Sequence, residues 1–140
     1  MNKDHLLFVI GRINYKVNRF LVQELRKHRI NGIVPSHGEI LGSLMIRGQL
    51  QMKEITDIID KDKSTITALI DKLVSMGYVD KTKDANDSRV SIIRLTKKGE
   101  ALKPAVVEIS EKLRAKAYKN ISEEEKEILN TLLRKLNANL

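Results

Sequence analysis

Small polar side chains cover one face of the segment between residues 62 and 77. On a helical wheel this face holds Ser64, Ala68, Asp71 and Ser75, flanked by Thr65, Thr67 and Lys72. Short hydroxyl and methyl groups let a helix lie deep in the major groove of DNA, where they meet the base edges. A surface helix with a solvated polar face would show the same pattern. The segment alone therefore predicts a helix but does not decide what it contacts.

A charged segment follows this helix directly. Two β-prone runs, residues 78–83 and 89–95, flank the turn-forming residues 84–88, which predicts a β-hairpin. Lys81, Lys83 and Arg89 lie beside its expected tip, where lysines can follow phosphates and a guanidinium can enter a minor groove. A plain solvated hairpin would also carry charges. The position of this hairpin, immediately after the helix, favours a wing that contacts DNA.

Apolar spacing predicts the elements that must hold these side chains. The apolar stripe of the segment 62–77 is formed by Ile66, Leu69, Ile70, Leu73 and Val74. Asp62 or Ser64 can cap its start, and Gly77 supplies a stop. Upstream, a second short helix has a predicted buried stripe of Met52, Ile55, Ile58 and Ile59. The polar turn at residues 60–62 joins the two helices into a helix-turn-helix candidate.

The chain resembles the MarR (multiple antibiotic resistance regulator) family of transcription factors along almost its whole length. The most specific motif is the wing signature D-x-R, five residues, then L-T, present as Asp87, Ser88, Arg89, VSIIR, Leu95 and Thr96. The run KSTITALIDKLVSMGYV resembles the recognition helix of the family. Two positions depart from the family pattern, because Ser88 and Lys81 stand where arginine is frequent. Compared with arginine, both residues lose length or the capacity for bidentate hydrogen bonds, so we expect the wing to contribute modest affinity for DNA.

The predicted fold is mostly α with a small β-hairpin wing, a winged helix-turn-helix with dimerisation helices at both ends. With 140 residues and 41% hydrophobic content, the chain can bury one modest core, so we expect a single domain over residues 1–140. Residues 36–96 would form the DNA-binding region. The resemblance implies that residues 1–30 and 97–140 form the dimerisation helices.

The terminal segments carry more apolar helix surface than so small a core can cover. Leu6, Ile10, Ile13, Val17, Phe20, Leu21 and Leu25 give the first helix a broad apolar face. Ser122 and Glu125 form a capping box before a leucine-rich helix, and Ser36 with Glu39 forms another before residue 40. Thr96 can cap a long helix over about 97–119, which Pro104 should bend or break. In the resembled family such helices interlock between subunits, which implies a homodimer on a pseudo-palindromic operator, its recognition helices ~34 Å apart.

Specific roles follow for the candidate DNA contacts. The recognition-helix candidates are Lys63, Ser64, Thr65, Thr67, Ala68 and Lys72. The wing candidates are Lys81, Lys83, Asp87, Ser88 and Arg89. Within the wing, we expect Asp87 to fix the turn or pair with a basic neighbour. Asp71 faces the groove side, so we expect it to pair with an arginine of the wing. Ser36 could present backbone amides to a phosphate or act as a plain helix cap.

Charge and composition narrow the class of protein. The net charge of +8 favours a polyanionic partner such as double-stranded DNA, but residues 1–50 hold most of the excess and residues 51–98 only +2. Because the chain has no cysteine, it has no disulfide and no thiol switch. No phosphate loop, G-x-S-x-G elbow or HExxH motif is present, so we expect no enzyme. No apolar run is long enough for a signal or a membrane span, so we expect a cytoplasmic location.

The effector is the least determined part of the function. Members of the resembled family often bind small anionic aromatic compounds, and Arg12, Tyr15, Lys16 and Arg19 could cradle a carboxylate or phenolate. A solvated basic face over the dimer seam is the simpler explanation of these residues. A metal site at Glu24 and His28, joined by His5, His37 and Glu39, lacks the spacing zinc requires, so we expect no metal or cofactor.

Two functions remain open on the sequence. The first is a transcriptional regulator, with a repressor favoured because no added domain for recruiting polymerase is visible. The alternative is a helical dimeric protein–protein interaction module without specific DNA binding. The alternative would show no steep loss of DNA affinity with salt.

Overall fold

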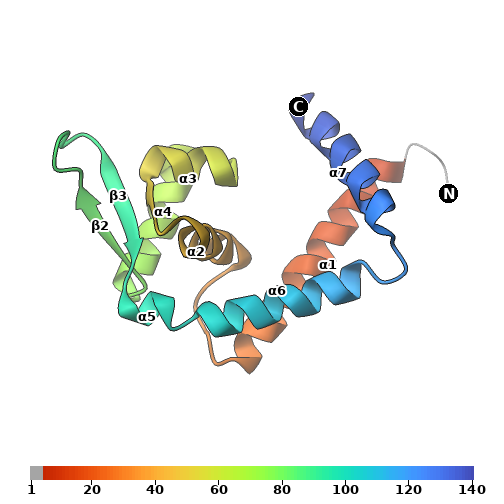
Figure 1. The fold of residues 1–140 in the computed structure, drawn as a ribbon, viewed down its shortest axis with the longest axis horizontal. Coiled ribbons are helices and arrows are strands. Elements are labelled where there is room, and N and C mark those ends of the chain that lie inside the picture. The colour runs from red at the N-terminus through yellow and green to blue at the C-terminus, as the bar shows by residue number, and fades with distance from the viewer. Residues whose placement is uncertain (1–4) are drawn as a thin grey trace.

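The computed structural model describes residues 5–140 and shows a mostly helical chain with one small sheet (Figure 1). In chain order the elements are α1 (Leu6–Lys27), α2 (Pro35–Arg47), β1 (Gln49–Gln51), α3 (Met52–Ile59), α4 (Lys63–Ser75), β2 (Val79–Lys83), β3 (Ser91–Leu95), α5 (Lys97–Glu100), α6 (Lys103–Ala117) and α7 (Glu123–Ala138). The segment from α2 to α5 forms the winged helix, and α1, α6 and α7 form an arm beside it. This arrangement confirms the predicted fold class.

The sheet is antiparallel, with strand order β1-β3-β2. The predicted hairpin is present, and Val79 of β2 lies opposite Leu95 of β3. The third strand, β1, was not predicted, because its three residues offer a single apolar side chain. That side chain, Leu50, lies opposite Ile93 of β3, and both are buried. The short strand thereby ties the start of α3 to the middle of the wing.

The core lies between the sheet and helices α2, α3 and α4. Its most deeply buried side chains are Ile40, Leu41, Leu44, Leu50, Ile55, Ile66, Ile70, Leu73, Val79 and Ile93. The predicted stripe of α4 is therefore correct at its centre, whereas Val74 lies at its exposed edge. The prediction was wrong for Ile58, which is 44% exposed. The core reaches the eight-residue helix α3 mainly through Ile55, and Ile58 points away from it.

Asp62 caps α4 and so decides where the helix begins. Its Oδ1 accepts a hydrogen bond from the backbone N–H of Thr65 at 2.7 Å and from Oγ of Ser64 at 2.8 Å. Of the two predicted caps, Asp62 is the one used, and Ser64 supports it. At the other end, Gly77 has φ +80°, a backbone conformation that a side chain would strain, and this stops the helix as expected.

The predicted capping box of Ser36 and Glu39 was wrong. Helix α2 begins at Pro35, whose fixed φ suits a first helical position, and this makes Ser36 the second residue. The third residue, His37, caps the helix instead, because its Nδ1 accepts a hydrogen bond from the backbone N–H of Val34 at 2.9 Å. A buried histidine thus takes the place expected of a serine and a glutamate.

The long helix predicted after Thr96 is broken in two. Oγ1 of Thr96 caps the short helix α5 by accepting a hydrogen bond from the N–H of Gly99 at 3.1 Å. Helix α6 then starts at Lys103 with Pro104 in its first turn, where a missing amide hydrogen does no harm. A Cβ at position 99 would collide with the backbone carbonyl of Tyr78. Only glycine lets α5 pack this closely on the start of β2.

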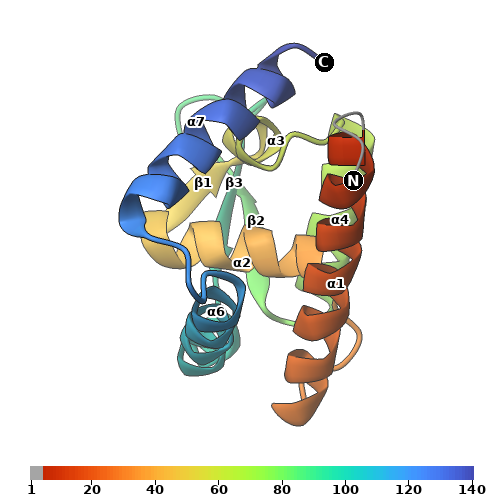
Figure 2. The ribbon, with the colours of Figure 1, turned by 90° about the vertical axis from the view of Figure 1, so that its right-hand side faces the viewer.

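The arm consists of helices from both ends of the chain. Figure 2 shows α1 and α7 standing apart, and Figure 1 shows α6 running from α5 past α1 toward α7. The capping box predicted for α7 is present, since the N–H of Glu125 donates to Oγ of Ser122 at 3.1 Å and the N–H of Ser122 donates to Oε1 of Glu125 at 3.0 Å. No residue of α7 is buried. Within residues 5–140, no helix is both long and apolar enough to cross a membrane.

Candidate nucleic-acid interface

The outer face of α4 presents the predicted recognition residues to solvent. Lys63, Ser64, Thr65, Ala68 and Lys72 are exposed, and Thr67 is half-buried. The hydroxyl of Thr67 donates to the carbonyl oxygen of Lys63 at 2.8 Å, whereas that of Ser64 donates to Asp62. These bonds use each hydroxyl as a donor and leave its oxygen free to accept. The side chains in the middle of this face are short, and a lysine lies on each side of them.

Asp71 binds the wing, but through a different residue from the one expected. Oδ1 of Asp71 lies 3.7 Å from Nζ of Lys81, so the expected arginine partner was wrong. Lys81 lies on β2, the strand that follows α4 in the chain, so its side chain can reach Asp71. The arginines of the wing lie farther along the hairpin. The pair is largely exposed and adds little stability, but it neutralises a carboxylate on the contact face.

Asp87 organises the tip of the wing. Its Oδ1 accepts hydrogen bonds from the backbone N–H of Arg89 at 3.0 Å and from Nε of Arg89 at 3.1 Å, and its Oδ2 accepts from Nη2 at 3.1 Å. The guanidinium lowers the pKa of Asp87 below its usual range, and the backbone N–H of Arg89 lowers it further. Asp87 therefore fixes the turn and pairs with a basic neighbour. The side chain of Arg89 remains 90% exposed.

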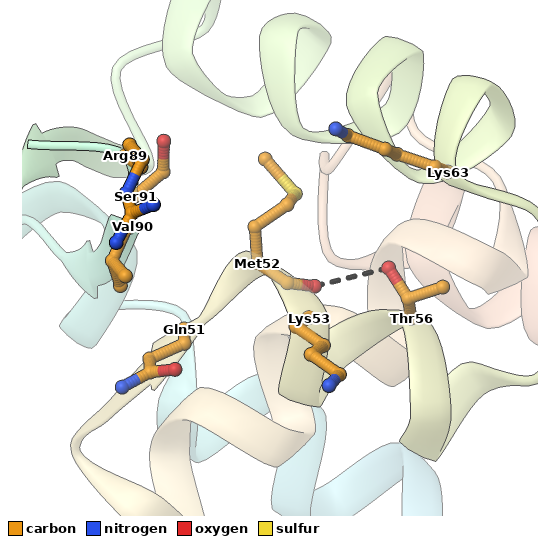
Figure 3. A pocket seen from close by; sticks show the side chains of 8 residues that line it. All are labelled: Gln51, Met52, Lys53, Thr56, Lys63, Arg89, Val90 and Ser91. Carbon is orange, nitrogen blue, oxygen red and sulfur yellow. Dashed lines mark hydrogen bonds between the residues drawn. The ribbon is translucent and has the colours of Figure 1, made fainter.

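A hollow of about 440 Å³ separates the wing from α3 and the start of α4. Its lining residues are Gln51, Met52, Lys53, Thr56, Lys63, Arg89, Val90 and Ser91. Figure 3 shows Met52 in the middle, between the wing residues and Lys63, with the hydroxyl of Thr56 bonded to the carbonyl oxygen of Met52. Three cationic side chains, Lys53, Lys63 and Arg89, belong to this lining. The hollow is positively charged at its rim and apolar at its floor.

The sequence analysis missed Lys53, Thr56 and Gln51 as candidate contact residues. Lys53 is the second residue of α3, and a lysine in the first turn of a helix gives no motif by itself. Only the strand β1, which carries Gln51 beside β3, brings this turn next to the wing. The missing signal was therefore the unpredicted strand.

Ser36 and His37 place the start of α2 near the recognition helix. Ser36 is half-buried at the second position of α2. Burial lowers the pKa of His37 below its ordinary value of 6.5, and the nearby ammonium group of Lys72 lowers it further. The imidazole is thus held in the neutral form that its capping hydrogen bond requires.

The residues suggested for an effector lie on α1 and are only partly gathered together. Tyr15 and Arg19 line a shallow hollow of about 390 Å³ with Asn18, Val22, Gln23 and Arg26. Arg12 and Lys16 are exposed on the same helix but outside this lining. All six lining residues come from α1, so the hollow has one wall in a single chain.

The suggested metal ligands are separated and otherwise engaged. Glu24 binds Lys27 and Lys112, His28 lies 3.6 Å from Glu108, and Nδ1 of His37 caps α2. Among residues 5–140, no three histidines or carboxylates converge as metal ligands would. The geometry gives no support to a metal centre in this part of the chain.

Comparisons with known proteins were made on sequence and on structure. A model described as MarR family matches residues 31–90. Among curated proteins, the HTH-type transcriptional regulator SarZ of Staphylococcus aureus is 36% identical over 85 residues, covering 60% of this chain and 56% of SarZ. The match thus spans little more than half of that relative. That relative is described as a transcriptional regulator.

Solved structures of the same fold cover nearly the whole chain. A MarR protein from Peptoclostridium difficile has a TM-score of 0.85 at 23% identity and covers 99% of this chain and 89% of its own. A mutant MarR from E. coli complexed with operator DNA has a TM-score of 0.77 at 24% identity, covering 97% and 99%. The reduced form of MarR from E. coli has a TM-score of 0.72 at 26% identity, covering 94% and 95%. The resemblance suggested by the wing signature is confirmed.

Proposed function

We propose that this chain is a MarR-family winged-helix protein that binds double-stranded DNA sequence-specifically as a homodimer and thereby regulates transcription. The family match covers the segment that holds α3, α4 and most of the hairpin. One observation carries the proposal. Lys63, the first residue of α4, and Arg89 of the wing line the same positively charged hollow, and the short side chains that follow Lys63 on α4 are exposed, as contacts to a major groove and the neighbouring minor groove require.

Helix α4 supplies the base contacts in this proposal. Ser64, Thr65 and Ala68 are short and exposed, so they allow the helix axis to approach the base edges. Thr67 lies at the edge of the face and contributes mainly its methyl group and acceptor oxygen. Lys72 lies to one side, where its ammonium group can reach a phosphate.

The wing supplies the minor-groove contact. Asp87 accepts hydrogen bonds from two nitrogens of the Arg89 guanidinium, which fixes the orientation of this exposed side chain. A preorganised arginine loses less conformational entropy on binding. Lys83 and Ser88 are exposed near the same tip and can follow the phosphates. Lys81 serves to hold the hairpin against α4.

The hollow between wing and α3 suits the sugar-phosphate strand that separates the two grooves. Lys53, Lys63 and Arg89 rim it, and Ser91 adds a hydroxyl. A strand lying there would meet three cations and the amides of the first turn of α3. A second phosphate can meet the amide of Ser36 at the start of α2. These contacts give affinity and orientation but no sequence preference.

The arm supplies the pairing surface for a second copy of the chain. Large apolar side chains are exposed along α1 and α7: Leu6, Leu7, Phe8, Ile13, Ile128, Leu129, Leu132 and Leu133. Exposed apolar side chains in this number are typical of protein interfaces. A two-fold pair would place two α4 helices about one DNA turn, ~34 Å, apart and read a pseudo-palindromic operator.

Repression with release by a small anionic aromatic compound fits this architecture. In this proposal, the winged helix would cover the promoter DNA that it binds, so binding would act by occlusion. Tyr15 and Arg19 offer a ring and a guanidinium in one hollow, and Arg12 and Lys16 raise the positive potential around it. A partner subunit over this helix would supply the missing wall. Benzoate is a suitable probe, and loss of bound DNA on its addition, weakened in Arg19→Ala, is the expected result.

The test of DNA binding is selection from a randomised duplex pool at two salt concentrations. We expect enrichment of a two-fold symmetric site with half-sites about 10 base pairs apart. With that site, Arg89→Ala should weaken binding. The logarithmic dependence of affinity on salt should become shallower by about 0.9 for each phosphate contact that is lost.

Arg114→Ala is the matched control, because it removes the same charge from an exposed position on α6, outside the lining of the hollow. Equal losses in both variants would mean that total charge, and not the wing, carries the affinity. Retention of all sequences alike, with no enrichment, would contradict specific binding and favour a protein–protein interaction module.

A further inference from the structure

A buried carboxylate lies where α1 meets α6. Glu24 of α1 is only 4% exposed. Its Oε1 accepts a hydrogen bond from Nζ of Lys27 at 3.1 Å, and its Oε2 accepts one from Nζ of Lys112 at 3.2 Å. The bond from Lys27 lowers the pKa of Glu24 most, burial partly opposes it, and Lys112 lowers it again. An ionised group in this position needs both partners, because an unpaired buried charge is strongly unfavourable.

The two lysines connect different parts of the molecule. Lys27 lies three residues farther along the same helix, so its bond connects only residues of α1. Lys112 belongs to α6, so its bond joins the two helices. One turn away, Nε2 of His28 lies 3.6 Å from Oε2 of Glu108 across the same crossing. Leu25 and Ile109 are buried in the core beside these pairs. Apolar contacts tolerate sliding, whereas a charged hydrogen bond has a preferred direction.

Helix α6 is in turn attached firmly to the winged helix. Gly99 brings α5 against the carbonyl of Tyr78, and α6 follows after the break at residues 101–102. Helix α6 also contacts α2. The crossing at Glu24 therefore determines how α1, which carries much of the proposed pairing surface, is oriented relative to the recognition helix of its own chain.

We propose that Glu24 is a positioning residue that sets the spacing of the two DNA half-sites by fixing the angle between α1 and α6. The proposal rests on the proposed function as a DNA-binding homodimer. Phe8 lies 16 residues from Glu24 along α1, which is ~24 Å at 1.5 Å per residue. A rotation of about 10° at Glu24 would thus shift the pairing surface by ~4 Å, about one base-pair step of ~3.4 Å.

The experiment measures spacing preference rather than affinity. Duplexes carry the half-sites selected by the wild-type protein, with the spacer lengthened or shortened by one or two base pairs. We expect wild type to prefer one spacing. In Glu24→Gln, the ratio of Kd between the altered and the preferred spacing should fall by about fivefold, the lower end of coupling between separated sites. Circular dichroism checks that each variant is folded.

Single lysine variants separate positioning from ordinary stabilisation. Lys112→Met removes the bond between the helices and should relax the spacing preference as Glu24→Gln does. Lys27→Met removes the bond within α1 and should leave it unchanged. Glu111→Gln, an exposed carboxylate next to Lys112 on α6, controls for net charge and should behave as wild type. Lys112→Met also serves if Glu24→Gln does not fold.

Three results would overturn the proposal. A wild-type spacing preference in both Glu24→Gln and Lys112→Met would show that other contacts set the angle. Equal relaxation in Lys27→Met and Lys112→Met would give Glu24 a local role within α1. Wild-type protein that binds no duplex would overturn the proposed function together with this inference, whereas binding with an unchanged spacing preference in the variants would overturn the inference alone.

Discussion

The winged helix and the arm use similar apolar side chains in opposite ways. Ile66 and Leu73 of α4 have no exposed surface, whereas Phe8 of α1 is 69% exposed and Leu132 of α7 is 51% exposed. The winged helix closes its core with its own strands and helices. The arm leaves its apolar surface exposed, and under the proposed function a second copy of the chain covers it. The apolar content of a helix therefore does not indicate whether the helix is buried in the core of its own chain or stays exposed.

This difference separates two kinds of stability. Burial inside the winged helix contributes to folding of one chain and is independent of protein concentration. Under the proposed function, burial of α1 and α7 against a second copy contributes by mass action, so its effect grows with concentration. Substitutions in the two regions should therefore respond differently when the protein is diluted.

The largest effect is expected from the closed core. Leu73→Ala should lower the free energy of unfolding by about 2–5 kcal/mol, because it removes a fully buried side chain and leaves a cavity. Urea denaturation at two protein concentrations measures this loss, which should be the same at both. Val74→Ala, one residue along and at the exposed edge, should change it by less than about 0.5 kcal/mol. Equal losses would contradict the assignment of the core.

Next comes a substitution in the arm. Leu132→Ala should weaken association of two chains by about 1.5–3 kcal/mol for each leucine that becomes buried in the dimer. Sedimentation equilibrium measures the dissociation constant, while circular dichroism should show an intact winged helix. The control is Ile46→Ala, because Ile46 is 86% exposed but lies on α2. The proposed pairing surface would be wrong if both variants dissociated equally.

A smaller effect is expected at the start of α7. Ser122→Ala removes the oxygen that accepts from the N–H of Glu125 and should destabilise the helix by about 1 kcal/mol. Because α7 lies in the arm, thermal unfolding should show the loss most clearly at protein concentrations near the dissociation constant of the proposed dimer. Thr131→Ala in the middle of α7 should cause no loss, since alanine is the better helix former. A concentration-independent loss would place α7 in the monomer core instead.

The smallest effect concerns pH and the start of α2. Burial lowers the pKa of His37, so the unfolded chain binds a proton more readily than the folded one. Stability should be fully present above the ordinary pKa of 6.5 and decrease as the pH falls toward the lower pKa of the folded state. His37→Asn keeps an acceptor for the N–H of Val34 but does not titrate. Denaturation midpoints should therefore lose this part of their pH dependence, and an unchanged slope would exclude His37 as its source.

Local patterns predicted the local features of this molecule well. Apolar periodicity, Gly77 and the capping box of Ser122 placed the ends of helices, because each depends on residues within a few positions. The strand β1 was missed because three residues have no period. Ser36 was misassigned because the helix begins at Pro35, which moves the N-cap by two positions, from Ser36 to Val34. Both errors concern the position of an element that depends on adjacent parts of the chain or the sheet more than on the periodicity of its own residues.

The candidate site shows the same limit. The wing signature identified Asp87 and Arg89 before their hydrogen bonds were seen, since both residues lie in one turn. Lys53 lies far from the wing in sequence, and only the sheet brings it to the hollow. Lys81 rather than an arginine binds Asp71, a matter of distances in space. Glu24 and Lys112 lie far apart in the sequence, so no local spacing pattern predicted the contact between them.

The order of elements along the chain has a consequence for synthesis on the ribosome. The winged helix is continuous from α2 to α5, so it can begin to close its core while the rest is still being made. The arm combines α1 with α6 and α7, which are made after the winged helix. Under the proposed function, pairing of two chains must therefore wait until α6 and α7 have been made. Under the proposed function, an interrupted chain would yield a monomeric winged helix, which would bind a half-site weakly and leave full-length partners free.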